Sequence, residues 1–332
     1  MNKKDNKLTI DDYVKGVLAC ERTVLARAIT LIESNNIAHI EKAQDILKEV
    51  LPHTGKAVRI GITGLPGAGK STFIEALGCH LTESGHKVAV LAVDPTSSIS
   101  RGSILGDKTR MEKLSRDPNA FIRPSPSSGV LGGVARKTRE SMLLFEAAGF
   151  DVILVETIGV GQNEITVRSM VDFILLLMIA GAGDELQGLK KGIMEIADAV
   201  VFNKADGDNL ERAKAAQSEY EKVLHYLYQA TEGWTTHAFT CSSLTGEGIP
   251  QIWQVIGKFR EVTGKTGVWD IRRRNQERDW LRALVDEQLH NLFINDSRIK
   301  DLLPQIEQAV VDGKQTALAA ARMLLEKFEK GS

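Results

Sequence analysis

The chain has 332 residues, of which 43% are hydrophobic and 26% are charged, and its formal net charge is −1 at neutral pH. This length allows a large buried core, and the balanced charge argues against a nucleic-acid-binding surface. Three cysteines, Cys20, Cys79 and Cys241, lie far apart and follow no disulfide or metal-binding pattern, so we expect reduced thiols and a cytoplasmic protein. The first residues carry no apolar signal segment, and the longest apolar run, 173–180, is too short to cross a membrane.

The first 56 residues have the pattern of a helical region. Over residues 8–50, apolar side chains recur at the spacing of a helix face that packs against a core. The face comprises Val17, Leu18, Val24, Leu25, Ala28, Ile29 and Ile32. A Pro-His-Thr-Gly segment at 52–55 breaks the pattern, so residues 1–56 are predicted to be an N-terminal helical extension.

A glycine-rich motif follows the first apolar run of the next region, 57–63. Residues 64–71, Gly-Leu-Pro-Gly-Ala-Gly-Lys-Ser, have the full spacing of a phosphate-binding P-loop, and a helical segment, 71–84, comes directly after. In such loops, backbone amides and a helix start attract phosphate, the lysine reaches the β- and γ-phosphates, and the serine hydroxyl binds Mg²⁺. The predicted phosphate-binding residues are Gly64, Leu65, Pro66, Gly67, Ala68, Gly69, Lys70, Ser71 and Thr72, with Lys70 also catalytic and Ser71 also a metal ligand.

Further apolar runs alternate with helical segments up to residue 262. They lie at 87–93, 152–155, 173–178, 199–202 and 237–241. Because each run is continuous rather than alternating, we expect parallel strands that are covered on both faces. The predicted fold class is therefore α/β: a doubly wound, mostly parallel sheet of the P-loop NTPase type over 57–262, with helices on both faces. The order of the strands does not follow from this pattern.

Three acidic residues stand at strand ends or in polar loops between the P-loop and residue 160. Asp94 and Glu156 each end or follow an apolar run, and Asp107 lies in a Gly-Asp-Lys-Thr segment. An acid in such a place can hold Mg²⁺ or its waters, although acids also commonly end strands and cap helices. We expect Asp94, Asp107 and Glu156 to be metal ligands, with Asp107 and Glu156 also catalytic. Gly159 is expected to offer its N–H to the γ-phosphate.

A second nucleotide motif follows the run 199–202. Its position after a strand places it at the edge where open α/β sheets bind ligands. The Asp206 carboxylate can accept hydrogen bonds from N1–H and N2–H of guanine, whereas adenine has no proton at N1. Downstream of a P-loop, this motif predicts GTP and GDP as ligands. The predicted guanine-binding residues are Asn203, Lys204 and Asp206 and, in a loop after the run 237–241, Ser242, Ser243 and Leu244.

Beyond residue 262 only helical spacing remains, so residues 263–332 are predicted to be a C-terminal helical arm. One apolar stripe contains Leu281, Leu284, Val285, Gln288 and Leu292, and another contains Leu318, Ala321, Leu325 and Phe328. Short helices need a surface to pack on, which either the main domain or a partner subunit can supply.

Six segments make the chain resemble one family, the MeaB/ArgK P-loop GTPases, which includes the methylmalonyl-CoA mutase-associated GTPase and the methylmalonic aciduria type A protein. The resemblance covers nearly the whole chain and is most specific between residues 58 and 206. It rests on the segments 64–72, 93–95, 102–111, 156–164, 183–192 and 203–206.

The resemblance implies a GTP-hydrolysing chaperone of an adenosylcobalamin-dependent acyl-CoA mutase. Such a chaperone controls cofactor loading and protects or reactivates the mutase, which in turn stimulates hydrolysis. Methylmalonyl-CoA mutase is the default client, and isobutyryl-CoA mutase or another relative stays open. The resemblance also implies a homodimer built through the arm 263–332, and a switch loop over 181–192 in which Asp184, Gln187 and Lys190 relay the nucleotide state. It implies neither a nucleic-acid nor a membrane partner.

The chain departs from the usual patterns in its switch segments. In Glu156-Thr-Ile-Gly-Val160, no glutamine stands directly after the glycine to orient the attacking water. We therefore predict slow intrinsic hydrolysis that a partner accelerates. Arg101 stands where family members often have glycine, and residues 179–181 lack a proline that is often found there.

Two other functions compete with this interpretation. One is a nucleotide-dependent kinase linked to arginine, lysine and ornithine transport, but Asp206 favours guanine and no acceptor-binding motif is evident. The other is a nickel-metallochaperone GTPase, which shares the P-loop and a similar base-reading motif. Against it, the seven histidines are scattered, and no cysteine lies near them in a ligand pattern.

Overall fold

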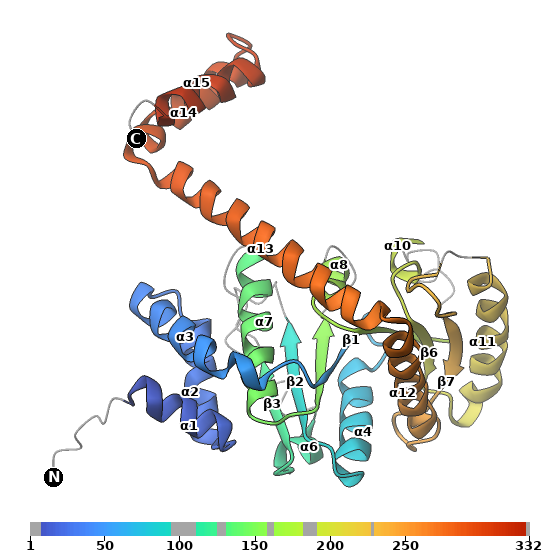
Figure 1. Cartoon of the computed structure of the whole chain (residues 1–332). Coiled ribbons are helices and arrows are strands. Elements are labelled where there is room, and N and C mark those ends of the chain that lie inside the picture. Colours follow the sequence, from blue (N-terminus) through green and yellow to red (C-terminus); the bar gives the residue numbers. More distant parts are fainter. Residues whose placement is uncertain are drawn as a thin grey trace. The chain divides into compact units, whose positions relative to one another are not determined.

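A computed structural model describes residues 8–93, 111–124, 131–157, 163–181, 191–226 and 229–329. The chain divides into two compact units, residues 1–272 and residues 273–332. No helix among the described residues is long and apolar enough to span a bilayer. Figure 1 shows the elements, which keep their labels below.

The larger unit is built on a parallel sheet, which in the described residues has seven strands in the order β3-β2-β4-β1-β5-β6-β7. The strands are β1 (Val58–Gly64), β2 (Val88–Val93), β3 (Ala120–Pro124), β4 (Val152–Thr157), β5 (Phe173–Ile179), β6 (Ala199–Asn203) and β7 (His237–Thr240). Central β1 pairs on one side with β4, in the register Val58↔Val152, and on the other with β5, in the register Ile60↔Phe173. The predicted parallel α/β sheet is thus confirmed. The edge strand β3 was not predicted.

Alternate residues of β1 face the two sides of the sheet, and this alternation shows which helices cover each side. Val58, Ile60 and Ile62 join a buried cluster with side chains of α4 (Lys70–Glu83), α6 (Glu112–Arg116) and α12 (Ile249–Thr266). On the opposite face, Arg59 pairs with Glu146 of α7 (Leu131–Ala147). The helix α8 (Asn163–Arg168) packs against β1 and β4, and α11 (Leu210–Leu224) packs against β6 and β7. The remaining short helices are η1 (Leu51–His53), α10 (Lys191–Met194) and η3 (Gly207–Asn209).

Three N-terminal helices cover α7: α1 (Ile10–Leu18), α2 (Arg22–Glu33) and α3 (Ile37–Val50). A capping box between Thr9 and Asp12 starts α1. The three helices lie within the predicted helical region, and most of its predicted apolar face is buried, namely Val17, Leu25, Ala28, Ile29 and Ile32. Leu18 is 38% exposed, because the first helix ends there and the chain turns through Cys20, whose φ is 56°.

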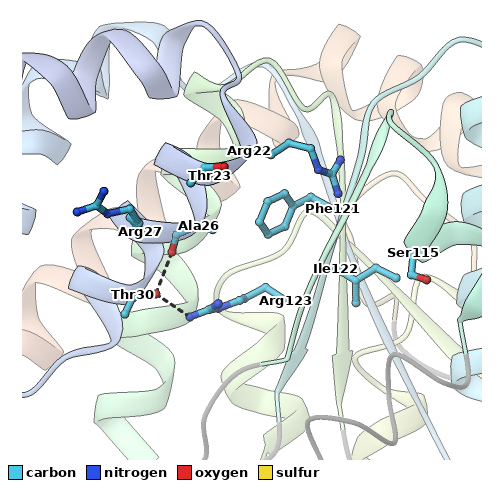
Figure 2. Close-up of a pocket in the computed structure, with 9 residues that line it drawn as sticks. All are labelled: Arg22, Thr23, Ala26, Arg27, Thr30, Ser115, Phe121, Ile122 and Arg123. Carbon is cyan, nitrogen blue, oxygen red and sulfur yellow. Dashed lines mark hydrogen bonds between the residues drawn. The ribbon is translucent and has the colours of Figure 1, made fainter. Parts of the chain in front are cut away.

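Two arginines join α2 to the edge strand β3 (Figure 2). Arg22 donates from Nη1 to the carbonyl oxygens of Pro118 (3.2 Å) and Ala120 (2.7 Å), and its guanidinium lies 5.2 Å from the centre of the Phe121 ring. Arg123 donates from Nε to Glu33 (2.8 Å) and pairs with it a second time through Nη2. A hollow of about 640 Å³ lies between the two elements. We assign it no ligand, because the guanidinium groups of Arg22 and Arg123 already have partners within the protein.

The smaller unit is entirely helical over its described residues. It contains the greater part of α13 (Val268–Asn295), followed by α14 (Ser297–Val311) and α15 (Ala317–Glu329). Asp296 caps α14 through the backbone N–H of Arg298, and α14 and α15 pack around a small core of Ile299, Ile306, Ala320 and Leu324. Large apolar side chains stay exposed along α13 and α15, namely Leu281, Val285, Leu289, Leu292, Leu318 and Leu325.

Candidate nucleotide site

The predicted phosphate loop lies between β1 and α4, at the carboxyl edge of the sheet. Its first glycine, Gly64, has a φ of 147°, and an added Cβ there would lie 2.0 Å from the carbonyl oxygen of Leu177 in the neighbouring β5. Gly69 caps α4 with a left-handed φ of 85°. Only glycine at position 64 can combine this positive φ with such close contact to the neighbouring backbone. The geometry of the turn therefore explains why the motif begins with glycine.

Two side chains at the start of α4 point back over this loop. The Lys70 ammonium donates to the carbonyl oxygens of Gly64 (2.9 Å) and Leu65 (3.1 Å). The Ser71 hydroxyl donates to Oε1 of Glu156, at the end of β4, over 2.9 Å. Glu156 is 5% exposed. Two of the four predicted metal ligands therefore lie together, while the predicted ligands Asp94 and Asp107, and Gly159 as well, fall outside the described residues.

Asn203, at the end of β6, connects the phosphate loop to the loop after β7. Its Nδ2 donates to the carbonyl oxygen of Ala68 over 2.8 Å. Its Oδ1 accepts hydrogen bonds from the Ser243 backbone N–H (3.1 Å) and hydroxyl (2.7 Å). The side chain is buried, and these bonds engage both ends of its amide. We had expected Asn203 to contact guanine, and the geometry gives it the further role of a clamp between two loops.

Asp206 follows Asn203 by three residues and is half-buried, with its carboxylate oriented by a serine. The Ser242 hydroxyl donates to Oδ2 of Asp206 and accepts from the Thr245 backbone N–H over 3.1 Å. Ser242 is itself buried, so its hydroxyl is a fixed donor. The arrangement holds one carboxylate at a defined position next to the P-loop, which suits a reader of paired N–H groups.

The other predicted base-site residues differ in exposure. Lys204 is exposed and has a left-handed backbone, with a φ of 60°. Its side chain passes the P-loop, since a Cβ built on Gly69 would lie 3.8 Å from Cε of Lys204. Leu244 is 84% exposed. The predicted relay residues Asp184, Gln187 and Lys190 lie outside the described residues.

Sequence reasoning missed the residue behind the clamp, Cys241. Its thiol is buried and lies 3.5 Å from Oδ1 of Asn203. Burial raises the pKa of the Cys241 thiol to about 12. The thiol therefore stays neutral at physiological pH and is a weak donor to Asn203 next to the loop after β7.

Comparison with known proteins identifies the family. Residues 25–298 match the family model of the methylmalonyl-CoA mutase-associated GTPase MeaB. The chain is 48% identical to the GTPase ArgK of Escherichia coli, over 88% of each chain. It is 44% identical to the mitochondrial methylmalonic aciduria type A homolog of Mus musculus, over 96% of this chain and 80% of the mouse protein.

A solved structure agrees with this relationship over the whole length. The crystal structure of a LAO/AO transport system kinase superposes with a TM-score of 0.79, at 38% identity, and covers 98% of this chain and 99% of that one. The chain therefore belongs to the family of the methylmalonyl-CoA mutase-associated GTPase MeaB.

Proposed function

We propose that this GTPase is a nucleotide-dependent chaperone of an adenosylcobalamin-dependent acyl-CoA mutase, with methylmalonyl-CoA mutase as the default client. In this role it controls the loading of the cofactor and protects or reactivates the mutase. The observation that carries the proposal is the family match over residues 25–298, in a chain whose P-loop, clamp and Asp206 lie together at one sheet edge.

The nucleotide would bind through its two ends. The amides of the loop 64–69 and the start of α4 attract the phosphates, and the Lys70 ammonium adds a positive charge that can leave its present carbonyl partners for phosphate oxygens. At the other end, the Asp206 carboxylate accepts from N1–H and N2–H of guanine, held in place by Ser242. The Asn203 clamp keeps the two ends at a fixed separation.

The side chains at the start of α4 and the end of β4 suit Mg²⁺. The Ser71 hydroxyl and the Glu156 carboxylate offer hard oxygen donors only 2.9 Å apart at the phosphate end of the site. Ser71 and Glu156 would hold the ion, with Asp94 and Asp107 as the other predicted ligands. When bound, Mg²⁺ neutralises charge that develops on the phosphates during hydrolysis.

Intrinsic hydrolysis should be slow, because Val160 occupies the position at which many GTPases carry a water-orienting glutamine. The client would then supply or order the missing element. We assign Asp184, Gln187 and Lys190 to the relay between nucleotide and client. On this proposal Lys190→Ala keeps GTP affinity and loses the acceleration by the mutase.

The smaller unit would provide the contact between two copies of the chain. Leu281 and Leu292 on α13 are 62% and 63% exposed, and Leu318 on α15 is 66% exposed. Exposed leucines at helical spacing suit a two-fold helical interface. Sedimentation should therefore give a dimer, and a Leu281→Glu, Leu292→Glu double variant should be monomeric while its GTP binding is retained.

The function is tested by measuring GTP turnover with and without purified methylmalonyl-CoA mutase. We expect acceleration by the mutase, binding that depends on the nucleotide, and loss of turnover in Lys70→Ala. A chain that hydrolyses GTP but neither binds nor responds to methylmalonyl-CoA mutase or isobutyryl-CoA mutase would contradict the chaperone proposal and leave the GTPase assignment intact.

A further inference from the structure

Asp198 places a buried negative charge at the start of β6, at the sheet edge opposite the nucleotide site. The residue is 0% exposed. Its Oδ2 accepts from the Ile174 backbone N–H over 2.9 Å and from Nη1 of Arg168, while its Oδ1 accepts from the Thr231 hydroxyl. A carboxylate this deeply buried requires such partners, because an unpaired charge in the interior is very costly.

Two arginines from different elements meet at this carboxylate. Arg168 is the last residue of α8, and it also donates to the carbonyl oxygen of Ala230 (3.0 Å). Arg272 lies in the first turns of α13, with Nη1 3.9 Å from Oδ2 of Asp198. It donates to the carbonyl oxygen of Asp172. One acid therefore holds the end of α8 and the root of α13, residues 268–272, in the same place.

Thr231 is the direct link between the two arginines. Its hydroxyl oxygen accepts from Nη2 of Arg272 and from Nη2 of Arg168 (3.1 Å), and the same hydroxyl donates to Asp198. We call these four residues, Arg168, Asp198, Thr231 and Arg272, the Asp198 cluster. Burial, with a further contribution from the charge of Arg168, lowers the pKa of the Arg272 guanidinium to about 10, so Arg272 remains charged at neutral pH.

The helix held by this cluster leads to the hydrolysis site. Only residues 158–162 separate β4, which ends with Glu156 and Thr157, from the start of α8. The helix also leans directly on the P-loop strand: a Cβ built on Gly61 of β1 would lie 2.8 Å from Cγ1 of Val167. Because closely packed elements transmit displacements, a shift of α8 at the Asp198 cluster should also shift β1 and the P-loop that follows it.

We propose that Asp198 is a positioning residue for GTP hydrolysis, which fixes α8 through Arg168. Through Thr231 and Arg272, Asp198 also couples the position of α8 to the position of the α13 root. The proposal uses only the GTPase activity and does not depend on the identity of the client. It predicts that the state of the nucleotide is sensed at residues 268–272, at the sheet edge opposite the phosphates.

The test uses the full chain and the Thr231→Val substitution. This change removes the linking hydroxyl at nearly constant volume, and each arginine keeps another partner, Arg168 on Asp198 and Arg272 on the Asp172 carbonyl. Single-turnover GTP hydrolysis should fall by about tenfold, as small misplacements in active sites do, while the dissociation constant of GTP stays within about twofold.

A second readout follows the α13 root directly. Amide hydrogen exchange of residues 268–272 is compared between the GDP form and the form with a non-hydrolysable GTP analogue. The wild-type chain should show a difference between the two nucleotides, and Thr231→Val should lose it. Glu33→Gln is the matched control, because it alters the Arg123–Glu33 ion pair, which joins α2 to β3.

Arg168→Lys provides a second variant should Thr231→Val fail to fold, since lysine keeps the charge and lacks the planar fork with which Arg168 donates to Asp198 from Nη1 and to Ala230 from Nη2. Exchange at 268–272 that is independent of the nucleotide in the wild-type chain would overturn the coupling. Turnover in Thr231→Val and Arg168→Lys equal to that of the Glu33→Gln control would overturn the positioning role.

Discussion

The Asn203 clamp makes a quantitative prediction for Asn203→Ala. The substitution removes the hydrogen bonds to the Ala68 carbonyl, the Ser243 N–H and the Ser243 hydroxyl. Each is worth about 1 kcal/mol net, so the free energy of unfolding should fall by about 3 kcal/mol. The buried Ala68 carbonyl loses this partner, so the loss of stability should be no smaller than this value.

The same change should weaken nucleotide binding. If GDP binds only when the two loops are aligned, the apparent affinity falls in proportion to the aligned fraction. A clamp worth about 3 kcal/mol, whose loss leaves about 1% of molecules aligned, implies a loss of about 100-fold in GDP affinity. IDP, which lacks the 2-amino group of guanine, should lose affinity by the same factor, because the clamp does not touch that group.

Calorimetric titration of GDP and IDP, with Mg²⁺ present, measures both affinities, and urea denaturation measures stability. Asn209→Ala is the matched control, since its Nδ2 donates a single exposed hydrogen bond to the Lys204 carbonyl oxygen (2.8 Å). If Asn203→Ala behaved like Asn209→Ala in both measurements, Asn203 would not be a clamp. If it lost affinity for GDP and not for IDP, Asn203 would read the 2-amino group of guanine instead.

Three further predictions concern the same edge of the sheet. Gly64→Ala should prevent stable folding or lower the free energy of unfolding by more than about 3 kcal/mol, because its Cβ would lie 2.0 Å from the Leu177 carbonyl oxygen. In the control Gly67→Ala, the added Cβ meets no described atom within 4 Å, so the cost should be about 1 kcal/mol. Thermal melts of the two variants measure the difference. The pKa of the Cys241 thiol is raised from 9.0 to about 12, so at pH 8 the thiol should be alkylated about 1,000-fold more slowly in the native chain than in urea, as measured by peptide mass spectrometry. Between pH 9 and 12 the folded chain keeps this proton and the unfolded chain loses it. The free energy of unfolding should therefore fall as the pH rises through that window. Asp206→Asn should reduce the preference for GDP over IDP by about 10-fold or more in competition binding, and an unchanged preference would remove Asp206 as the base reader.

The continuous apolar runs predicted the parallel sheet because each central strand is buried on both faces and needs apolar side chains at every position. The strand β3 escaped this reasoning. It has only five residues, Ala120–Pro124, and ends in Arg-Pro. As an edge strand it needs fewer apolar residues and tolerates a proline, so its composition does not distinguish it from a loop.

At the candidate nucleotide site, the motifs singled out Lys70 and Asp206 because P-loops and guanine-binding motifs have a fixed spacing. The sequence could not show that Asn203 joins Ala68 to Ser243, since the three residues are far apart in the chain. The Asp198 cluster was invisible for the same reason: isolated charges of either sign are common, and only the fold brings them together.

The guanidinium of Arg22 has a consequence for the chain in solution. By occupying the outward carbonyls of Pro118 and Ala120, it denies a passing extended polypeptide two of the acceptors with which it could extend the sheet. Pro124 closes the far end of the same strand, because it has no N–H to offer. A single long side chain and an imino acid thus hinder sheet extension at both ends of the described edge strand β3.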